Sequence, residues 1–490
     1  MLSTEVLRRP GVRLGLLLTI GVASFVVLPA AADPLDGDPA MWATIARTVG
    51  ASGDWLRLRF NGEPYFNKPP LFFWATWAAM KAAGANAFGA SLASGLFGVL
   101  DLLLLWAVGR VMFRSSDVGF AAALAFATTH EVVHWTRGVH LESLLVAWNL
   151  LGLLAAHRSV EDPRAIVPLA AALAGGWLTK GPQGLFPAAV AAALWAREGR
   201  LRERLVSRPA RLGAALLALA VLPWLVAQLT SEGAFFHEYV RGQIGAVMFG
   251  SGDVPRGIAF YPQKLFATYW PWLPFAAAGA WMLGRGRPST ESRLWLLDGA
   301  IVGLVMLAAT VRKTRYLYPL YPALSVYAGV ALVGLARRVP RLLDALGLAA
   351  LVSALAIAAL AGRGQDRSAQ TLERRDDAIA IASLLPPDAR TWLARDVSLE
   401  DSPGLGKVLG FHAAPLLCDC GSPCTPSGRG PIRVVALAAD ADQVAAEIGG
   451  TVLHRTRSLA LVGAPDGADV RGTTCVDVAP PGGISAEAAA

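Results

Sequence analysis

The sequence predicts a polytopic α-helical membrane protein that ends in a small α/β domain. Of its 490 residues, 54% are hydrophobic and only 16% are charged, whereas a soluble globular chain carries about 25% charged residues. Apolar segments alternate with short polar loops in residues 1–363, and a mixed composition follows in residues 364–490. The net charge of +8 comes largely from arginines in the short loops, which is the positive-inside pattern of membrane proteins and argues against nucleic-acid binding.

The first predicted element is the apolar segment of residues 14–31, which follows Arg8, Arg9 and Arg13. These arginines, together with the small residues at 30–32, imitate a secretory signal and its cleavage site. The segment is long for a signal, however, and many more apolar segments follow it. We therefore predict an uncleaved first transmembrane helix.

A polar interruption over residues 33–70 comes next, and it contains Asp36 and Asp38. Ionisable groups next to a bilayer are costly unless they are paired or hydrated, so they are functional candidates. The alternatives are a solvated loop, an acidic loop that binds calcium, and capping of the next helix by Asp38. Apolar residues recur at helical spacing between Met41 and Val49, which predicts a short amphipathic helix on the membrane surface.

Residues 71–84 form an apolar segment that is too short to cross a bilayer. About 14 residues give roughly 21 Å of helix, and the hydrocarbon core is about 30 Å thick. Counting this segment as a span would also place the most basic loop, residues 197–211, outside the cell. We therefore predict a juxtamembrane helix.

With that assignment the chain has roughly eleven transmembrane spans, a cytoplasmic N-terminus and an external C-terminal domain. The predicted spans are residues 14–31, 87–113, 118–134, 143–156, 165–179, 183–196, 212–229, 267–284, 295–311, 318–336 and 342–362. The polar residues that break the apolar pattern then lie on the outer face. They include Asp36, Asp38, Lys68, Arg137, Glu142, Lys180, Lys313, Arg315 and Tyr318. This topology predicts that one membrane face carries the function.

The segment from residue 364 onward mixes strand-like and helical patterns, which predicts a small α/β domain. We expect strands at residues 391–393, 408–411, 432–437 and 458–462, and helices at residues 376–385 and 440–448. All four cysteines lie in this domain, at Cys418, Cys420, Cys424 and Cys475. Their spacing is too compact for a paired Cys-x-x-Cys zinc site, so we predict two disulfides, with a metal site or free thiols as alternatives.

The outer carboxylates predict acid–base chemistry. Asp36 and Asp38 lie two residues apart, and one of them could act as the general base that deprotonates a hydroxyl or amine acceptor. A second acid nearby helps to raise one pKa toward neutrality, and Glu142 on another outer loop is the expected partner.

The outer cations predict a phosphate site. Lys68, Arg137, Lys180, Lys313 and Arg315 could neutralise the charge of a phosphate leaving group, although a lysine at this depth could instead reach the lipid headgroups. The histidines at 130, 134 and 140 form only a weak metal motif, and no glycine-rich nucleotide loop occurs. No cofactor is predicted, and a divalent metal is not indicated.

Four motifs, taken together, resemble those of a known family. Asp38 and residues 42–47, 52–55, 60–62, 65–71 and 74 are similar to the first outer loop of the bacterial GT-C glycosyltransferases, which comprise the aminoarabinose lipid A transferases and protein O-mannosyltransferase-like relatives. Residues 137–142 resemble the second acidic motif, with Glu142 in place of the usual aspartate. Residues 178–182 resemble the Thr-Lys-Gly-Pro motif, and residues 318–322 the late outer loop. The resemblance covers roughly residues 10–365.

The resemblance implies an enzyme of the bacterial inner membrane that takes a sugar from a polyprenyl-phosphate donor. Transfer would occur at the periplasmic face, with inversion, to a lipid, glycan or protein acceptor. By position, Asp38 would be the catalytic base and Glu142 its supporting acid. The donor phosphate would be held by Lys68, Lys313, Arg315 and Arg137. The pocket would be lined by Asp36, Trp42, Tyr65, Lys180 and Tyr318.

The chain departs from the family pattern at three further places. Asp38-Pro39 replaces Asp-Glu, Asn67 replaces the glutamate before Lys68, and the pair His237-Glu238 stands in reversed order. These departures leave the sugar and the acceptor open. The alternative function is a transporter or an envelope assembly protein for lipid-linked glycans, although a transporter would show repeats and charges near the bilayer midplane.

Overall fold

The computed structural model divides the chain into two compact units. It describes residues 8–27, 35, 37–230, 235–250, 257–360, 369–386, 388–394, 397, 405–413, 417–418, 430–466, 468 and 470. The first unit, here the membrane unit, takes residues 1–33, 49–58 and 65–364. The second, here the C-terminal unit, takes residues 34–48, 59–64 and 365–490. Two segments near the start of the chain therefore group with its end.

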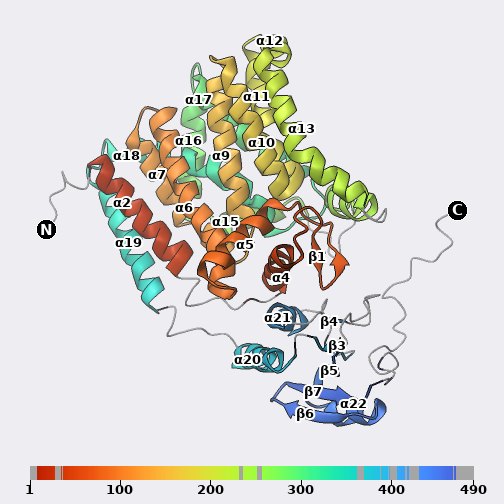
Figure 1. Ribbon diagram of the computed structural model, residues 1–490. Coiled ribbons are helices and arrows are strands. Elements are labelled where there is room, and N and C mark those ends of the chain that lie inside the picture. Colours follow the sequence, from red (N-terminus) through yellow and green to blue (C-terminus); the bar gives the residue numbers. More distant parts are fainter. Residues whose placement is uncertain are drawn as a thin grey trace. The chain divides into compact units, whose positions relative to one another are not determined.

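The membrane unit is built from helices. In chain order they are α2 (Pro10–Gly21), η1 (Val22–Val27), α5 (Leu71–Ala83), α6 (Ala87–Val111), α7 (Ser116–Ala127), α8 (His130–Thr136), α9 (Glu142–Ser159), η2 (Pro163–Ala165), α10 (Ile166–Lys180), η3 (Gly181–Leu185), α11 (Phe186–Arg197), α12 (Leu201–Val206) and α13 (Arg208–Leu229). They continue with η4 (Phe236–Gly245), α14 (Ala246–Phe249), α15 (Phe260–Thr268), α16 (Leu273–Gly284), α17 (Thr290–Ala308), η5 (Thr314–Leu320), α18 (Tyr321–Ala336) and α19 (Leu342–Leu360). Helix α10 lies between α9 and α13 (Figure 1).

Five helical segments in the described part of the chain are long and apolar enough to cross a membrane. They are Pro10–Val27, Ala87–Val111, Arg208–Leu229, Thr314–Ala336 and Leu342–Ala359. Each falls on a predicted span, and the chain is a polytopic helical membrane protein. The number of roughly eleven spans stays a prediction. Residues Leu71–Ala83 form a separate helix, α5, of only 13 residues.

The predicted span over residues 118–134 is not one helix. Helix α7 ends at Ala127 and α8 begins at His130. The hydroxyl of Thr128 donates to the carbonyl of Leu124 at 2.7 Å, and that of Thr129 to the carbonyl of Ala125, also at 2.7 Å. Such bonds from threonine to the preceding turn compete with continuation of the helix, and the chain continues as the separate short helix α8.

Small residues allow the helices of the membrane unit to approach closely. A Cβ atom built on Gly109 of α6 would lie 2.1 Å from the backbone nitrogen of Gly119 in α7. One built on Gly279 of α16 would lie 1.8 Å from the carbonyl oxygen of Tyr327 in α18. Because lipid is as apolar as leucine, helices in membranes associate through such close packing.

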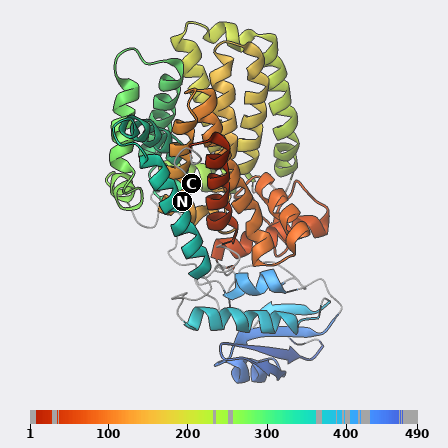
Figure 2. The same cartoon turned by 90° about the vertical axis from the view of Figure 1, so that its left-hand side faces the viewer.

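The C-terminal unit contains a five-stranded mixed sheet. Its strands are β3 (Arg390–Leu393), β4 (Leu417–Cys418), β5 (Ile432–Leu437), β6 (Thr451–Arg455) and β7 (Leu459–Ala464), in the order β4-β3-β5-β7-β6. Strands β4, β3 and β5 are parallel, and β5, β7 and β6 are antiparallel. Helices α20 (Ala369–Ser383), α21 (Leu405–His412) and α22 (Ala441–Glu447) accompany the sheet (Figure 2).

Side chains alternate across this sheet. In β5, Val435 packs into one apolar cluster together with residues of α20 and α21. Its neighbours Val434 and Ala436 pack into another cluster together with residues of α22. Because successive side chains of a strand point to opposite faces, the period-two pattern of Ile432–Leu437 buries both faces of the sheet.

One predicted strand is wrong. Residues 408–411 lie in helix α21, and Leu409 and Ala413, which directly follows the helix, are four positions apart and both fully buried. An apolar run of four residues does not distinguish a strand from a helix, and here the helical period decides. Cys418 lies on β4, whereas Cys420, Cys424 and Cys475 fall outside the described residues, so the two disulfides stay a prediction.

Candidate active site

The centre of the candidate site is an ion pair between Glu142 and Lys180. The ammonium of Lys180 donates to Glu142 Oε1 at 3.0 Å, and the two side chains are only 8% and 1% exposed. The other carboxylate oxygen, Oε2, is buried and has no hydrogen-bond partner within the described chain. The pair therefore keeps one acceptor atom for a further donor, such as a substrate hydroxyl.

Each partner of this pair occupies a favourable helix end. Glu142 opens α9, and Lys180 closes α10. A carboxylate is stabilised by the positive end of the helix dipole and an ammonium by the negative end. Ser94 of α6 fixes the start of α9, because it exchanges hydrogen bonds with the backbone of His140 and its carbonyl accepts one from the hydroxyl of Ser143.

Gly181 explains why a glycine follows Lys180. Its φ of +64° is in the left-handed region, which ends α10 at little steric cost only for glycine. A Cβ atom there would also lie 2.2 Å from the hydroxyl of Tyr239. Immediately afterwards, η3 packs back on α10 through backbone contact between Gly176 and Gly184. The Thr-Lys-Gly-Pro sequence thus builds a rigid helix end that presents the lysine.

Charges around the pair keep Glu142 ionised. Burial raises the pKa of the Glu142 carboxyl, but the charges of Lys180, His140 and Arg315 lower it by more, so the net direction is downward. Burial lowers the pKa of Lys180, and Arg315 lowers it further, while Glu142 opposes both. The nitrogen of Lys180 also lies 5.8 Å from the ring centre of Tyr316. The site therefore combines one carboxylate with two neighbouring cations.

Tyr318, a predicted pocket residue, is fully buried beside this cluster. Its hydroxyl is 2.6 Å from the hydroxyl of Thr136, and its ring contacts that of Phe126 at 6.0 Å between centroids. Its hydroxyl is thus held by α8, the short helix that follows the threonine break. Arg137 directly follows α8 and is half-buried.

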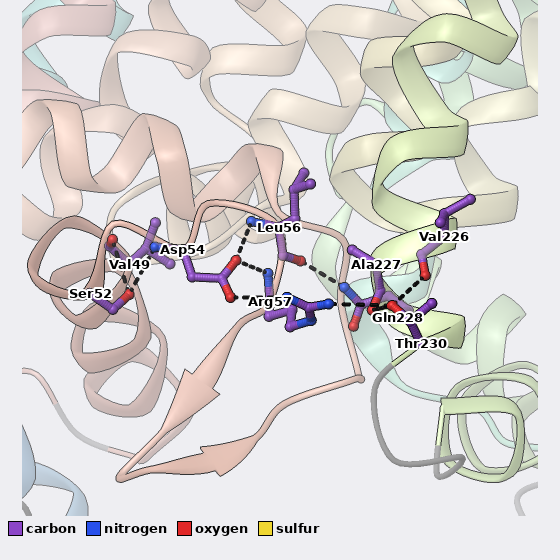
Figure 3. Close-up of polar contacts among 9 residues, drawn as sticks. All are labelled: Val49, Ser52, Asp54, Leu56, Arg57, Val226, Ala227, Gln228 and Thr230. Atoms are coloured by element: carbon purple, nitrogen blue, oxygen red, sulfur yellow. Dashed lines mark hydrogen bonds and ion pairs between the residues drawn. The ribbon is translucent and has the colours of Figure 1, made fainter.

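The loop that carries Lys68 is attached to the membrane unit. Asp54 accepts hydrogen bonds from the backbone nitrogens of Leu56 and Arg57, and Gln228 at the end of α13 donates to the carbonyl of Leu56 at 2.7 Å (Figure 3). The guanidinium of Arg57 donates to the hydroxyl of Thr230 at 3.3 Å (Figure 3). These contacts hold residues 54–57 against the end of α13.

Further along this loop, Tyr65 is buried and its ring packs on Phe73 at 5.9 Å. The ammonium of Lys68 is half-buried and donates to the carbonyl of Asn67 at 3.0 Å. Lys313 is exposed and precedes η5, whereas Arg315 is half-buried inside it. The predicted phosphate ligands thus come from several elements of the same unit.

Asp38 and Trp42 lie on helix α4 (Gly37–Ser52), in the part that belongs to the C-terminal unit. Asp38 is half-buried in the first turn of the helix, and Trp42 is buried one turn later. Asp36 lies outside the described residues. The predicted amphipathic helix over residues 41–49 therefore exists and extends further at both ends.

Three residues near the ion pair were not predicted to take part in the site. His140 and Tyr316 act on the charges of Glu142 and Lys180, and Tyr239 covers Gly181. His140 and Tyr316 lie within two residues of predicted site residues, so proximity in sequence could have found them. Tyr239 comes from η4, and nothing in its local sequence indicates the contact.

Among the described residues, no three or more His, Cys, Asp or Glu side chains form a group that could hold a metal ion. In the histidine-rich segment, His130 stacks on His134 at 6.2 Å between ring centroids, and its Nδ1 lies 3.8 Å from Glu131. The side chains of His237 and Glu238 are outside the description. Independence from metal stays a prediction.

The apolar helices and the buried charge cluster define a polytopic membrane protein with a candidate site for an anionic ligand. Residues 67–226 match the family described as dolichyl-phosphate-mannose-protein mannosyltransferase. An undecaprenyl phosphate-alpha-4-amino-4-deoxy-L-arabinose arabinosyl transferase 2 of Pseudomonas fluorescens is 28% identical over 70% of this chain and 61% of its own length. The corresponding transferase of Pseudomonas paraeruginosa is 30% identical over 70% of this chain and 64% of its own length.

Two solved structures share the fold. The crystal structure of ArnT from Cupriavidus metallidurans bound to undecaprenyl phosphate matches with a TM-score of 0.73 and 18% identity, over 95% of this chain and 99% of that one. The Archaeoglobus fulgidus oligosaccharyltransferase matches with a TM-score of 0.54 and 12% identity, over 89% of this chain and 69% of that one. These matches confirm the resemblance predicted from the motifs: the chain is similar to the aminoarabinose transferases and shares the fold of the ArnT structure. It spans less than two-thirds of the length of the two curated relatives.

Proposed function

We propose that the protein is a membrane glycosyltransferase that moves a sugar from a polyprenyl-phosphate donor to a periplasmic lipid, glycan or protein acceptor, with inversion. The observation that carries the proposal is the buried pair of Glu142 and Lys180 beside Arg315. Cations gathered at a buried carboxylate favour an anionic ligand, and the single negative charge of a sugar phosphodiester suits such a site.

In the proposed mechanism Asp38 removes the proton of the acceptor hydroxyl, and the acceptor oxygen attacks the anomeric carbon. The bond between that carbon and the phosphate oxygen breaks, and the phosphate leaves with the electron pair. Lys68, Lys313, Arg315 and Arg137 compensate the charge of the leaving group, which then needs no proton. Glu142 supports the reaction by holding Lys180 and by accepting a hydrogen bond at its second oxygen.

Composition and charge support a matching location. We place the protein in the bacterial inner membrane, with about eleven spans, a cytoplasmic N-terminus and a periplasmic domain over residues 364–490. The arginine-rich loop of residues 197–211 would then be cytoplasmic. The relatives are named for undecaprenyl phosphate-linked aminoarabinose, so this compound is the first donor to test.

Sugar transfer measured in membranes would test the proposal. Membranes that contain the wild-type protein should move label from one member of a panel of polyprenyl-phosphate sugars into an acceptor. Asp38→Asn should lower the rate by about 10²- to 10⁴-fold, the usual contribution of a general base. Full transfer by this variant would exclude Asp38 as the base. Flux of lipid-linked sugar across vesicles without any transfer would favour the transporter.

A further inference from the structure

Helix α4 carries the proposed base and is fastened to the far end of the chain. The guanidinium of Arg47, near the middle of this helix, donates to three backbone carbonyls of the C-terminal unit. They belong to Gly410 at 3.0 Å, to Ala413 at 2.9 Å, and to Phe411. The bonded residues are more than 360 positions apart in the sequence.

The three carbonyls share one physical property. Those of Gly410 and Phe411 lie in the last turn of α21 (Leu405–His412), which leaves its carbonyls without partners in the helix, and that of Ala413 follows the helix directly. A cation there is also favoured by the negative end of the helix dipole. Arginine suits this role because its planar fork carries five N–H donors in fixed directions. The Arg47 guanidinium also lies 5.7 Å from the ring centre of Phe411.

A second segment of the loop over residues 33–70 packs near α21 in the C-terminal unit. The hairpin formed by β1 (Arg59–Phe60) and β2 (Glu63–Pro64) places Phe60 against the apolar cluster that contains Leu409 of α21. Both segments of the loop that belong to the C-terminal unit, residues 34–48 and 59–64, thus contact it at or near α21. The loop residues between them belong to the membrane unit.

We propose that Arg47 is a positioning residue for the transfer reaction and that, through it, the C-terminal unit sets the place of Asp38. This inference rests on the proposed function of Asp38 as the base. Nine residues separate the two side chains, or about 14 Å along the helix, so Arg47 does not touch the reacting atoms. A helix transmits tilt at one point to its end, and a displacement of about 1 Å can slow a reaction about 100-fold.

The test is steady-state kinetics on the purified full-length protein. Arg47→Met keeps the aliphatic stem and removes every donor, and it should lower kcat by about 10- to 100-fold. The KM for the donor should change by less than about twofold, because the proposed phosphate ligands belong to the membrane unit. Arg47→Lys keeps the charge but not the fork, and it should recover part of the lost rate. Arg59→Met is the control, because Arg59 is exposed and bonds only the hairpin carbonyl of Gly62 in the described chain.

Hydrogen exchange separates this inference from the proposed function. Amides of residues 37–48 should exchange faster in Arg47→Met than in the wild type, while those of α9 and α10 should not change. This outcome supports fastening of α4 even if no donor is transferred, a result that would refute the proposed function alone. Unchanged exchange together with unchanged kcat would overturn the role of Arg47. A fall in kcat with equal loss of protection in α9 and α10 would also overturn it, because the variant would then act through global unfolding.

Discussion

At the scale of single residues, Glu142 and Lys180 depend on each other. Replacing a buried ion pair by apolar residues is often nearly neutral, but removing one partner leaves an uncompensated charge and destabilises a protein by about 3–5 kcal/mol. Lys180→Met should therefore lower the midpoint of thermal unfolding markedly and abolish transfer, because it strands the Glu142 carboxylate. The unfolding midpoint of the purified protein in detergent measures the first effect, and the membrane transfer assay measures the second.

The control for this variant is Lys81→Met, which makes the same change at an exposed lysine at the end of α5. It should leave both the unfolding midpoint and the rate unchanged. The double variant Glu142→Gln/Lys180→Met should be more stable than Lys180→Met alone, because it also removes the charge of the carboxylate that the single variant leaves without its partner. Equal unfolding midpoints of the Lys180→Met and Lys81→Met variants would show that the pair is exposed to solvent in the folded protein.

At the scale of elements, glycines decide which helices touch. A Cβ atom on Gly119 of α7 would lie 2.4 Å from the carbonyl oxygen of Trp106 in α6, so Gly119→Ala should destabilise the protein by about 1–3 kcal/mol. A Cβ on Gly303 of α17 would meet nothing within 4 Å, and Gly303→Ala should be neutral or stabilising by up to about 1 kcal/mol. Comparing the two unfolding midpoints checks the prediction, and the same shift in both would contradict close contact of α6 with α7.

The helices and strands also show how much of the fold could be predicted from the sequence. Apolar segments of 18 residues or more identified the long helices, and runs rich in valine and leucine identified β5 and β7, because local period and length determine these elements. The run at residues 408–411 was too short to distinguish a helix from a strand. The break at Thr128 depends on threonine hydroxyls that donate to carbonyls of the preceding turn. Glu142 and Lys180 were found through motifs, but their pairing depends on the packing of α9 against α10. The contact of Arg47 with α21 has no local signal, because it joins residues 364 positions apart.

At the scale of the whole molecule, the residues assigned to the proposed reaction belong to two different units. The proposed phosphate ligands Lys68 and Arg315 belong to the membrane unit, and Asp38 belongs to the C-terminal unit. A chain that ends at residue 364 should therefore still bind undecaprenyl phosphate, seen as a rise in its unfolding midpoint with added lipid. It should transfer sugar at least about 10- to 100-fold more slowly, since α4 loses the carbonyls that hold Arg47. Transfer at the full rate would show that α4 is placed by the membrane unit alone. Loss of lipid binding as well would show that the membrane unit does not fold without residues 365–490.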